Sequence, residues 1–164
     1  MEKYGKYAEQ ARDPELKNLF RNIQQEEQKH YESLSMILSG SVPECNCNDR
    51  SGKDYQPKAV YTAMSSPEDK QHDAFLATDC IGTEKLVSGT YNDDVFAFGD
   101  SGVRKLLADI QIEEQNHAEM LYKYKNSEWN GITAKSIHLL KFCPYFFRYC
   151  RRVIPVYFLN TFPR

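Results

Sequence analysis

Apolar residues recur along most of the chain at the three- and four-residue steps of an α-helix. Two of these runs have the spacing of a heptad seam, in which one stripe of the helix faces a partner. The first stripe consists of Leu16, Phe20, Ile23, Leu34 and Ile37, and the second of Val103, Leu107, Ile110 and Leu121. Both stripes are interrupted by polar residues at seam positions, where a buried apolar residue would be expected.

The interruptions belong to an internal repeat. Residues 23–34 read IQQEEQKHYESL and residues 110–121 read IQIEEQNHAEML, at a constant offset of 87 residues. A repeat of this length indicates a duplicated supersecondary unit. The repeat puts the motif Glu-x-x-His on the seam twice, as Glu27 with His30 and Glu114 with His117. Burying a carboxylate and an imidazole is costly unless they are paired or bind a metal.

Capping residues predict where the helices begin and end. Asp and Ser are preferred N-caps, and Pro is favoured in the first helical turn. Such starts occur at Asp13-Pro14-Glu15 and Ser66-Pro67-Glu68-Asp69, and Gly99-Asp100 forms a turn before a further start. Gly40 is the expected C-terminal cap of the second helix. The predicted helices cover residues 1–12, 14–39, 67–98 and 101–125.

The connection of residues 40–65 is long and rich in Gly, Pro, Asn and Asp. A linker of this length inside a compact domain needs a structural reason, and a crossover along the length of a bundle supplies one. We therefore predict an all-α fold with a ferritin-like four-helix bundle, built from two helical hairpins joined by a long crossover. The predicted domain spans residues 1–130, with the linker at 40–65.

Glu84 also lies on a seam, in the third helix. Counted from the turn at 98–101, Glu84 and Glu114 fall at nearly the same height of an antiparallel hairpin, so Glu84, Glu114 and His117 are expected to share one layer. The repeat offset puts the first-half counterpart of Glu84 before residue 1. We therefore predict a truncated first helix: either the true start lies upstream or the chain is a fragment.

Bulk composition narrows the function classes. The chain has 164 residues, 41% of them hydrophobic, and a formal net charge of −2, so nothing indicates a nucleic-acid partner. It has no N-terminal apolar run, and its five cysteines are irregularly spaced, which fits reduced intracellular thiols better than a disulfide framework. Cys45 and Cys47 in the linker are expected to be solvated, and His72 and His138 are expected to be ordinary surface histidines.

The last segment, residues 131–164, has a different character. It has six basic residues, no acidic ones and a dense aromatic content, and Pro144 and Pro155 would break a long helix. Its longest charge-free run, 153–163, has 11 residues, which is too short for the roughly 20 of a transmembrane helix. Two interpretations stay open: an interfacial or partner-binding arm, and a tail without a native role.

The polar seam residues predict a metal site. A Glu on one helix and Glu-x-x-His on its neighbour, repeated, is the ligand pattern of ferritin-like di-iron and di-manganese bundles. The predicted ligands are Glu27, His30, Glu84, Glu114 and His117, with iron or manganese as the candidate ions. The alternative is a metal-free polar layer, in which protonated Glu and neutral His hydrogen-bond and fix the helix register. Glu26 and Glu113 lie one position off the seam and are predicted to be solvated.

Two segments resemble a known family. Residues 2–34, EKYGKYAEQARDPELKNLFRNIQQEEQKHYESL, and residues 83–124, TEKLVSGTYNDDVFAFGDSGVRKLLADIQIEEQNHAEMLYKY, are similar to the spore coat protein F family. The resemblance implies a ferritin-like bundle made in the mother-cell cytoplasm and deposited in the endospore coat, with a structural and non-enzymatic role. Members have a full first helix, so this chain resembles a truncated or tail-altered member.

Three functional hypotheses follow. The first is a non-catalytic coat component that associates with itself or with other coat proteins, with no catalytic residues, no certain cofactor and no transmembrane segment. The second is a di-metal carboxylate oxidoreductase or metal-binding protein of the rubrerythrin or manganese-catalase type, in which the metal pair would activate peroxide or oxygen. The third is a fragment of the first without a function of its own.

Overall fold

The fold was taken from a computed structural model, which describes residues 2–44, 51–61 and 65–129. Residues 1–129 form one compact unit, and within the described ranges the regular structure is entirely helical. The helices are α1 (Glu2–Gln10), α2 (Pro14–Leu38), α3 (Ser51–Asp54), α4 (Pro67–Asp94), the short 3-10 helix η1 (Val95–Ala97) and α5 (Ser101–Trp129). The predicted all-α bundle is confirmed.

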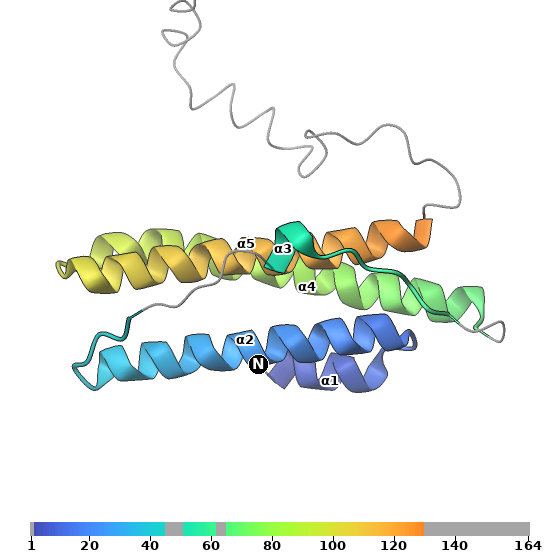
Figure 1. Cartoon of the computed structure of the whole chain (residues 1–164), viewed down its shortest axis with the longest axis horizontal. Coiled ribbons are helices and arrows are strands. Elements are labelled where there is room, and N and C mark those ends of the chain that lie inside the picture. Colours follow the sequence, from blue (N-terminus) through green and yellow to red (C-terminus); the bar gives the residue numbers. More distant parts are fainter. Residues whose placement is uncertain (1, 45–50, 62–64, 130–164) are drawn as a thin grey trace, which may run out of the picture. The chain divides into compact units, whose positions relative to one another are not determined.

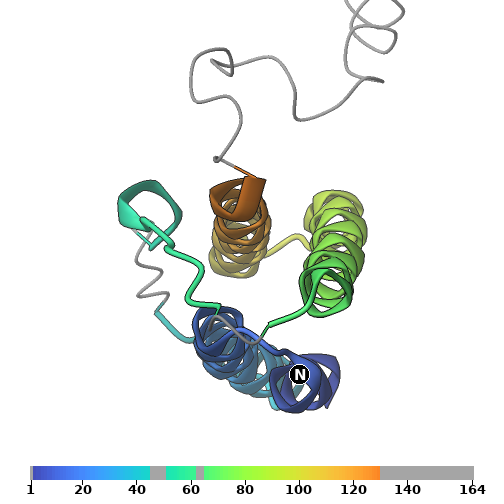
Figure 2. The ribbon, with the colours of Figure 1, turned by 90° about the vertical axis from the view of Figure 1, so that its right-hand side faces the viewer.

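The long helices pair as two antiparallel hairpins, α1 with α2 and α4 with α5 (Figures 1 and 2). Their predicted caps form. The Ser66 hydroxyl accepts from Asp69 N while the Asp69 side chain accepts from Ser66 N, which is a reciprocal capping box. Gly40 follows α2 with a φ of 87°, a conformation that favours glycine. Helix α4 ends at Asp94, before the predicted end at residue 98, because η1 replaces its last turn.

The connection between the hairpins runs from the end of the bundle where α2 stops to the opposite end where α4 begins (Figure 1). It is anchored on the way, since Lys123 donates to Gly52 O and the Tyr55 hydroxyl donates to Glu15 Oε1 at 2.9 Å. As a result α2 and α4 point in the same direction. Among helical bundles, a single long crossover of this kind is the connection found in ferritin-like folds.

A buried aspartate joins the connection to α2 and α5. Asp13 caps α2, accepting from Glu15 N at 2.9 Å. It also accepts from Tyr124 Oη of α5 at 2.9 Å and from Val60 N of the crossover at 3.0 Å. The carboxylate is fully buried, so these donors replace the water that it loses on folding.

A second buried aspartate, Asp73 of α4, holds the turn between α1 and α2. Its carboxylate accepts from Arg12 N at 2.9 Å and from Asp13 N at 2.7 Å. The Tyr61 hydroxyl of the crossover donates to it at 3.1 Å. Asp73 therefore accepts from backbone N–H groups of the turn, which have no partner within a helix, and it connects the first hairpin to the second.

The apolar core occupies the end of the bundle nearest these aspartates. Its buried members are Tyr4, Ala8, Ala11, Leu16, Leu19, Phe20, Ile23, Leu76, Ala77, Cys80, Met120, Leu121 and Tyr124. The hydrophobic positions predict a seam in α4 that continues from Glu84 to Val87 and Phe98, and beyond Glu84 this prediction is wrong in detail. Ser88 is buried where Val87 was expected, and Phe98 is 41% exposed because η1 changes the helical period after Asp94.

The first helix has nine residues against 25 in α2, in line with the expected short first helix. The predicted basic aromatic tail at 131–164, with His138, lies outside the described residues, as do Cys45 and Cys47. In the described part of the chain, no helix combines the length and the apolar run that crossing a membrane would need.

Replacing Asp73 tests its role in joining the hairpins. In the variant Asp73→Ala, the N–H groups of Arg12 and Asp13 lose their acceptor inside the protein, so we expect the free energy of unfolding to fall by about 2–5 kcal/mol. Urea unfolding measures the change. The matched control is Asp93→Ala, which removes an exposed carboxylate from the same helix. This substitution should change the free energy of unfolding by no more than about 0.5 kcal/mol. Equal effects of both substitutions would contradict the assignment.

Candidate metal centre

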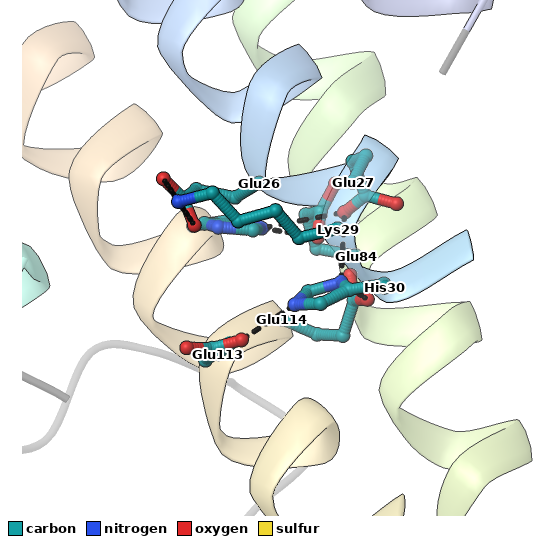
Figure 3. Close-up of polar contacts among 8 residues, drawn as sticks. Glu26, Glu27, Lys29, His30, Glu84, Glu113 and Glu114 are labelled. Atoms are coloured by element: carbon teal, nitrogen blue, oxygen red, sulfur yellow. Dashed lines mark hydrogen bonds and ion pairs between the residues drawn. The ribbon is translucent and has the colours of Figure 1, made fainter. Parts of the chain in front are cut away.

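Three helices bring all five predicted ligand residues into one layer of the bundle. Helix α2 contributes Glu27 and His30, α4 contributes Glu84, and α5 contributes Glu114 and His117. Figure 3 shows the labelled members from the three helices converging between them. One ligand atom each from Glu27, Glu84, Glu114 and His117 lies within 4.8 Å of the others. The three-residue spacing of each Glu-x-x-His motif puts its two side chains on the same helix face.

The contacts inside the layer alternate carboxylate and imidazole. His30 Nδ1 lies 3.2 Å from Glu114 Oε1 and 3.8 Å from Glu27 Oε1. His117 Nδ1 lies 3.4 Å from Glu27 Oε1 and 3.6 Å from Glu84 Oε2. The two imidazole rings are stacked, with centroids 5.9 Å apart and planes inclined by 26°. Each imidazole thus presents its Nδ1 atom to carboxylate oxygens from different helices.

The inward-facing atoms are buried and have no hydrogen-bond partner. They are Glu27 Oε1, His30 Nδ1, Glu84 Oε2, Glu114 Oε1 and His117 Nδ1, one from each predicted ligand. The residues Glu84, Glu114 and His117 are at most 2% exposed and His30 is 5% exposed. Leaving a buried polar atom unpaired costs about 1–3 kcal/mol, and more for a charged group. The five unpaired atoms indicate a place for a cation, and the group of Glu27, Glu84, Glu114 and His117 is close enough to share one ion.

Two further residues hold the ligands in position. The Tyr4 hydroxyl of α1 donates to Glu84 Oε1, so only Oε2 of this carboxylate faces the layer. Glu113 Oε2 lies 2.5 Å from His30 Nε2 and fixes the orientation of that ring. The prediction that Glu113 is solvated was therefore wrong. Its side chain is only 15% exposed, because it reaches across to α2.

The two repeats differ in this supporting shell. Glu26, the counterpart of Glu113, forms an ion pair with Lys29 at 2.8 Å (Figure 3). The position that corresponds to Lys29 in the second copy is Asn116, which carries no charge to hold Glu113 on its own helix. A single difference between the repeats thus explains why Glu113 supports a histidine of the layer and Glu26 pairs along its own helix.

Sequence reasoning missed both supporting residues. The partner of the Tyr4 hydroxyl depends on how α1 packs against α4, which the period of α1 does not indicate. Glu113 lies one position off the seam of α5, and its partner belongs to α2. The signal available in the sequence was the residue three positions after each glutamate. Lys29 follows Glu26 in the first copy, whereas the uncharged Asn116 follows Glu113 in the second. His72, predicted to be a surface residue, lies half-buried on α4 outside the layer.

Electrostatics in the layer favours charged imidazoles when no metal is bound. Burial by itself lowers the pKa of His30, but the carboxylates of Glu113, Glu114 and Glu27 outweigh it and raise the pKa to about 9. For His117, burial is outweighed by Glu27 and Glu84, and the pKa rises to about 10. A metal ion would therefore have to displace protons from both rings.

The carboxylates respond in opposite directions. Burial raises the pKa of Glu114 to about 8, and the neighbouring Glu84 adds to the rise. Burial also acts to raise the pKa of Glu84, but contacts with His117, Glu114 and Tyr4 outweigh it, and the pKa is lowered. Without metal, Glu84 is the carboxylate that keeps its charge and Glu114 tends to keep a proton. The layer is thus a coupled acid–base cluster and differs from the predicted set of neutral side chains.

The donor set fits a divalent transition metal. Carboxylate oxygen with imidazole nitrogen suits iron, manganese and zinc, and no thiolate is present among the five ligands. The five unpaired atoms converge from three helices, and Tyr4 and Glu113 supply the supporting contacts that metal ligands commonly have. Metal binding stays a prediction, and the metal-free polar layer stays its alternative.

Fold and layer together define a class: an all-helical bundle with one long crossover and a buried cluster of carboxylates and imidazoles at mid-height. Comparison with known proteins then gives a family match. Residues 72–128, which lie in α4 and α5, match the family model of the Coat F domain. The match indicates a role in the spore coat. It ends within α5, and it does not extend over α1 and α2.

No curated protein and no solved structure matches the chain.

The raised pKa values predict how stability depends on pH in chelator-treated protein. A group whose pKa is higher in the folded than in the unfolded state stabilises folding at low pH, and this stabilisation is lost as the pH rises through the folded value. For His30 and His117, the free energy of unfolding should fall between pH 6.5 and about 10. Glu114 acts in the same direction from 4.5 to about 8.

Urea unfolding at a series of pH values, with a chelator present throughout, measures this slope. The variant His117→Gln keeps a polar side chain of similar size without an imidazole that titrates, so it should show a shallower fall. A wild-type profile no steeper than that of the variant would contradict the assignment of charged imidazoles.

Proposed function

We propose that this chain is a structural, non-catalytic component of the bacterial endospore coat. The observation that carries the proposal is the match of residues 72–128 to the Coat F domain, which covers most of α4 and α5. The protein would be made in the mother-cell cytoplasm and then deposited in the coat. Its partners would be other coat proteins and further copies of itself.

The outer surface of the bundle supports assembly. Several large apolar side chains are exposed, among them Leu38 at 89%, Phe96 at 85% and Leu86 at 71%. Leu38 and Phe96 lie at the same end of the bundle, where α2 stops and α4 turns into α5 (Figure 1). Exposed apolar groups that gather on a surface often mark sites of association. An assembly protein needs such surfaces and does not need turnover.

Spore fractionation tests the coat role. With the chain epitope-tagged and expressed in a sporulating host, we expect the protein in the alkaline-detergent extract of purified spores, where coat proteins are released. It should be detected in the mother cell before the coat is complete. It should be depleted from the spore cores that remain after the coat has been extracted. Recovery only from the mother-cell lysate, with none in washed spores, would contradict the proposal.

A second candidate function is that of a ferritin-like oxidoreductase or metal-binding protein. The five buried unpaired ligand atoms favour it, and the single long crossover supports the ferritin-like comparison. When bound, an iron or manganese ion would supply Lewis acidity and redox chemistry at the layer. The chain's own residues would orient the ion and exclude water from it, since four of the five ligands are buried.

Equilibrium dialysis against Mn²⁺, Fe²⁺ and Zn²⁺, followed by metal analysis, tests this candidate on the full chain. We expect stoichiometric binding that raises the melting temperature, and a loss of affinity of more than about tenfold in His117→Ala, because the ring supplies a direct ligand. The control is His72→Ala, which removes an imidazole of α4 outside the layer.

Three results are distinguishable. Bound metal together with peroxide or oxygen turnover would favour an enzyme and contradict the non-catalytic proposal. Bound metal without turnover would give a coat protein with a structural metal. Protein that stays metal-free, with a stability unaffected by chelator, would leave the layer as a network of acid–base contacts.

A further inference from the structure

The dimensions of the polar layer determine how many ions it can hold. The ligand atoms of Glu27, Glu84, Glu114 and His117 all lie within 4.8 Å of one another. Around a single ion with bonds of about 2.1 Å, opposite ligands are about 4.2 Å apart. A pair of ions about 3.5–4 Å apart would separate the outermost ligand atoms by about 8 Å. The separation of these four ligand atoms therefore fits the shell of one ion.

The carboxylate oxygens limit the number of ions in a second way. A shared pair of ions needs carboxylates that direct both oxygens inward. Glu84 directs only Oε2 to the layer, because Oε1 accepts from the Tyr4 hydroxyl. Glu27 and Glu114 likewise have one buried unpaired oxygen each, in both cases Oε1. The donor atoms that lie within 4.8 Å of one another come from these three glutamates and His117, and His30 is outside this group, so the layer offers four donors to one ion.

The described part of α1, Glu2–Gln10, contacts the layer through a tyrosine. The acidic residues of this helix are Glu2 and Glu9, and both are exposed. The residue that α1 does direct to the layer is Tyr4, which is 3% exposed and hydrogen-bonds a carboxylate oxygen. Helix α1 thus contributes a hydrogen-bond donor to the layer.

We infer that the layer is a mononuclear site. It would take one divalent transition-metal ion, of the iron and manganese class, on Glu27 Oε1, Glu84 Oε2, Glu114 Oε1 and His117 Nδ1, with His30 outside the ligand shell. Tyr4 is a positioning residue that holds Glu84 in the one-oxygen orientation. The inference rests on the proposed metal binding and differs from a di-metal centre in the number of ions and in the role of α1.

Titration of the full, chelator-stripped chain with Mn²⁺ tests the number of ions. We expect binding to saturate at one ion per chain, and the bound ion to give the electron paramagnetic resonance spectrum of an isolated Mn²⁺. Two ions per chain with the spectrum of an exchange-coupled pair would overturn the mononuclear inference and leave metal binding intact. Failure to bind any ion would overturn the proposed metal binding itself, so the two failures are distinguishable.

The variant Tyr4→Phe tests the positioning role, because it keeps the buried ring and removes only the hydroxyl. We expect a changed zero-field splitting of the bound Mn²⁺ and weaker binding, with the helical circular dichroism unchanged. The matched control is Tyr7→Phe on the same helix, whose hydroxyl donates to Asp79 at 2.8 Å outside the layer. A spectrum and an affinity for Tyr4→Phe that match those of wild type and of Tyr7→Phe would overturn the role of Tyr4.

Discussion

Mutual compensation of charge among five buried ionisable side chains is the interaction on which the middle of this bundle depends. Glu27, His30, Glu84, Glu114 and His117 occupy positions that would otherwise be apolar, and their inward atoms lie at ion-pair distances without hydrogen bonds. Isolated charges in such surroundings would be very unfavourable. The helices must therefore approach closely enough for imidazoles of one hairpin to meet carboxylates of the other. A cation at this point, or protons on both rings, satisfies the same electrostatic requirement.

The remaining polar groups of the interior form a separate, fully paired set. Asp13 and Asp73 lie at the end of the bundle where α2 and α4 begin, and their oxygens accept from backbone N–H groups and from tyrosines of α5 and the crossover. The difference between the two buried clusters is informative. The aspartates are satisfied by fixed donors and act as structural joints, whereas the mid-height layer has acceptors and nitrogens with no partner. Only the second cluster has the chemistry of a ligand site.

The two copies of the repeat supply equivalent residues to the layer but differ in the contacts that support them. Matching positions in the two copies supply Glu27 with Glu114 and His30 with His117, so the layer has an approximate two-fold arrangement. That symmetry fails in the supporting contacts. Lys29 holds Glu26 on its own helix, while Glu113 is available to His30, and Tyr4 of α1 donates to Glu84.

The sequence by itself determined the helical periods, the caps at Asp13, Ser66 and Asp100, and the five seam positions that carry Glu or His, because these are local properties of one helix. It also determined that Glu84 and Glu114 share a level, since a short turn fixes the register of an antiparallel hairpin. Contacts between the hairpins are not encoded in the period of any one helix. The reach of Tyr4 to Glu84, the crossing of Glu113 to His30 and the small span of the ligand atoms were decided by tertiary packing, which brings together residues some 80 positions apart.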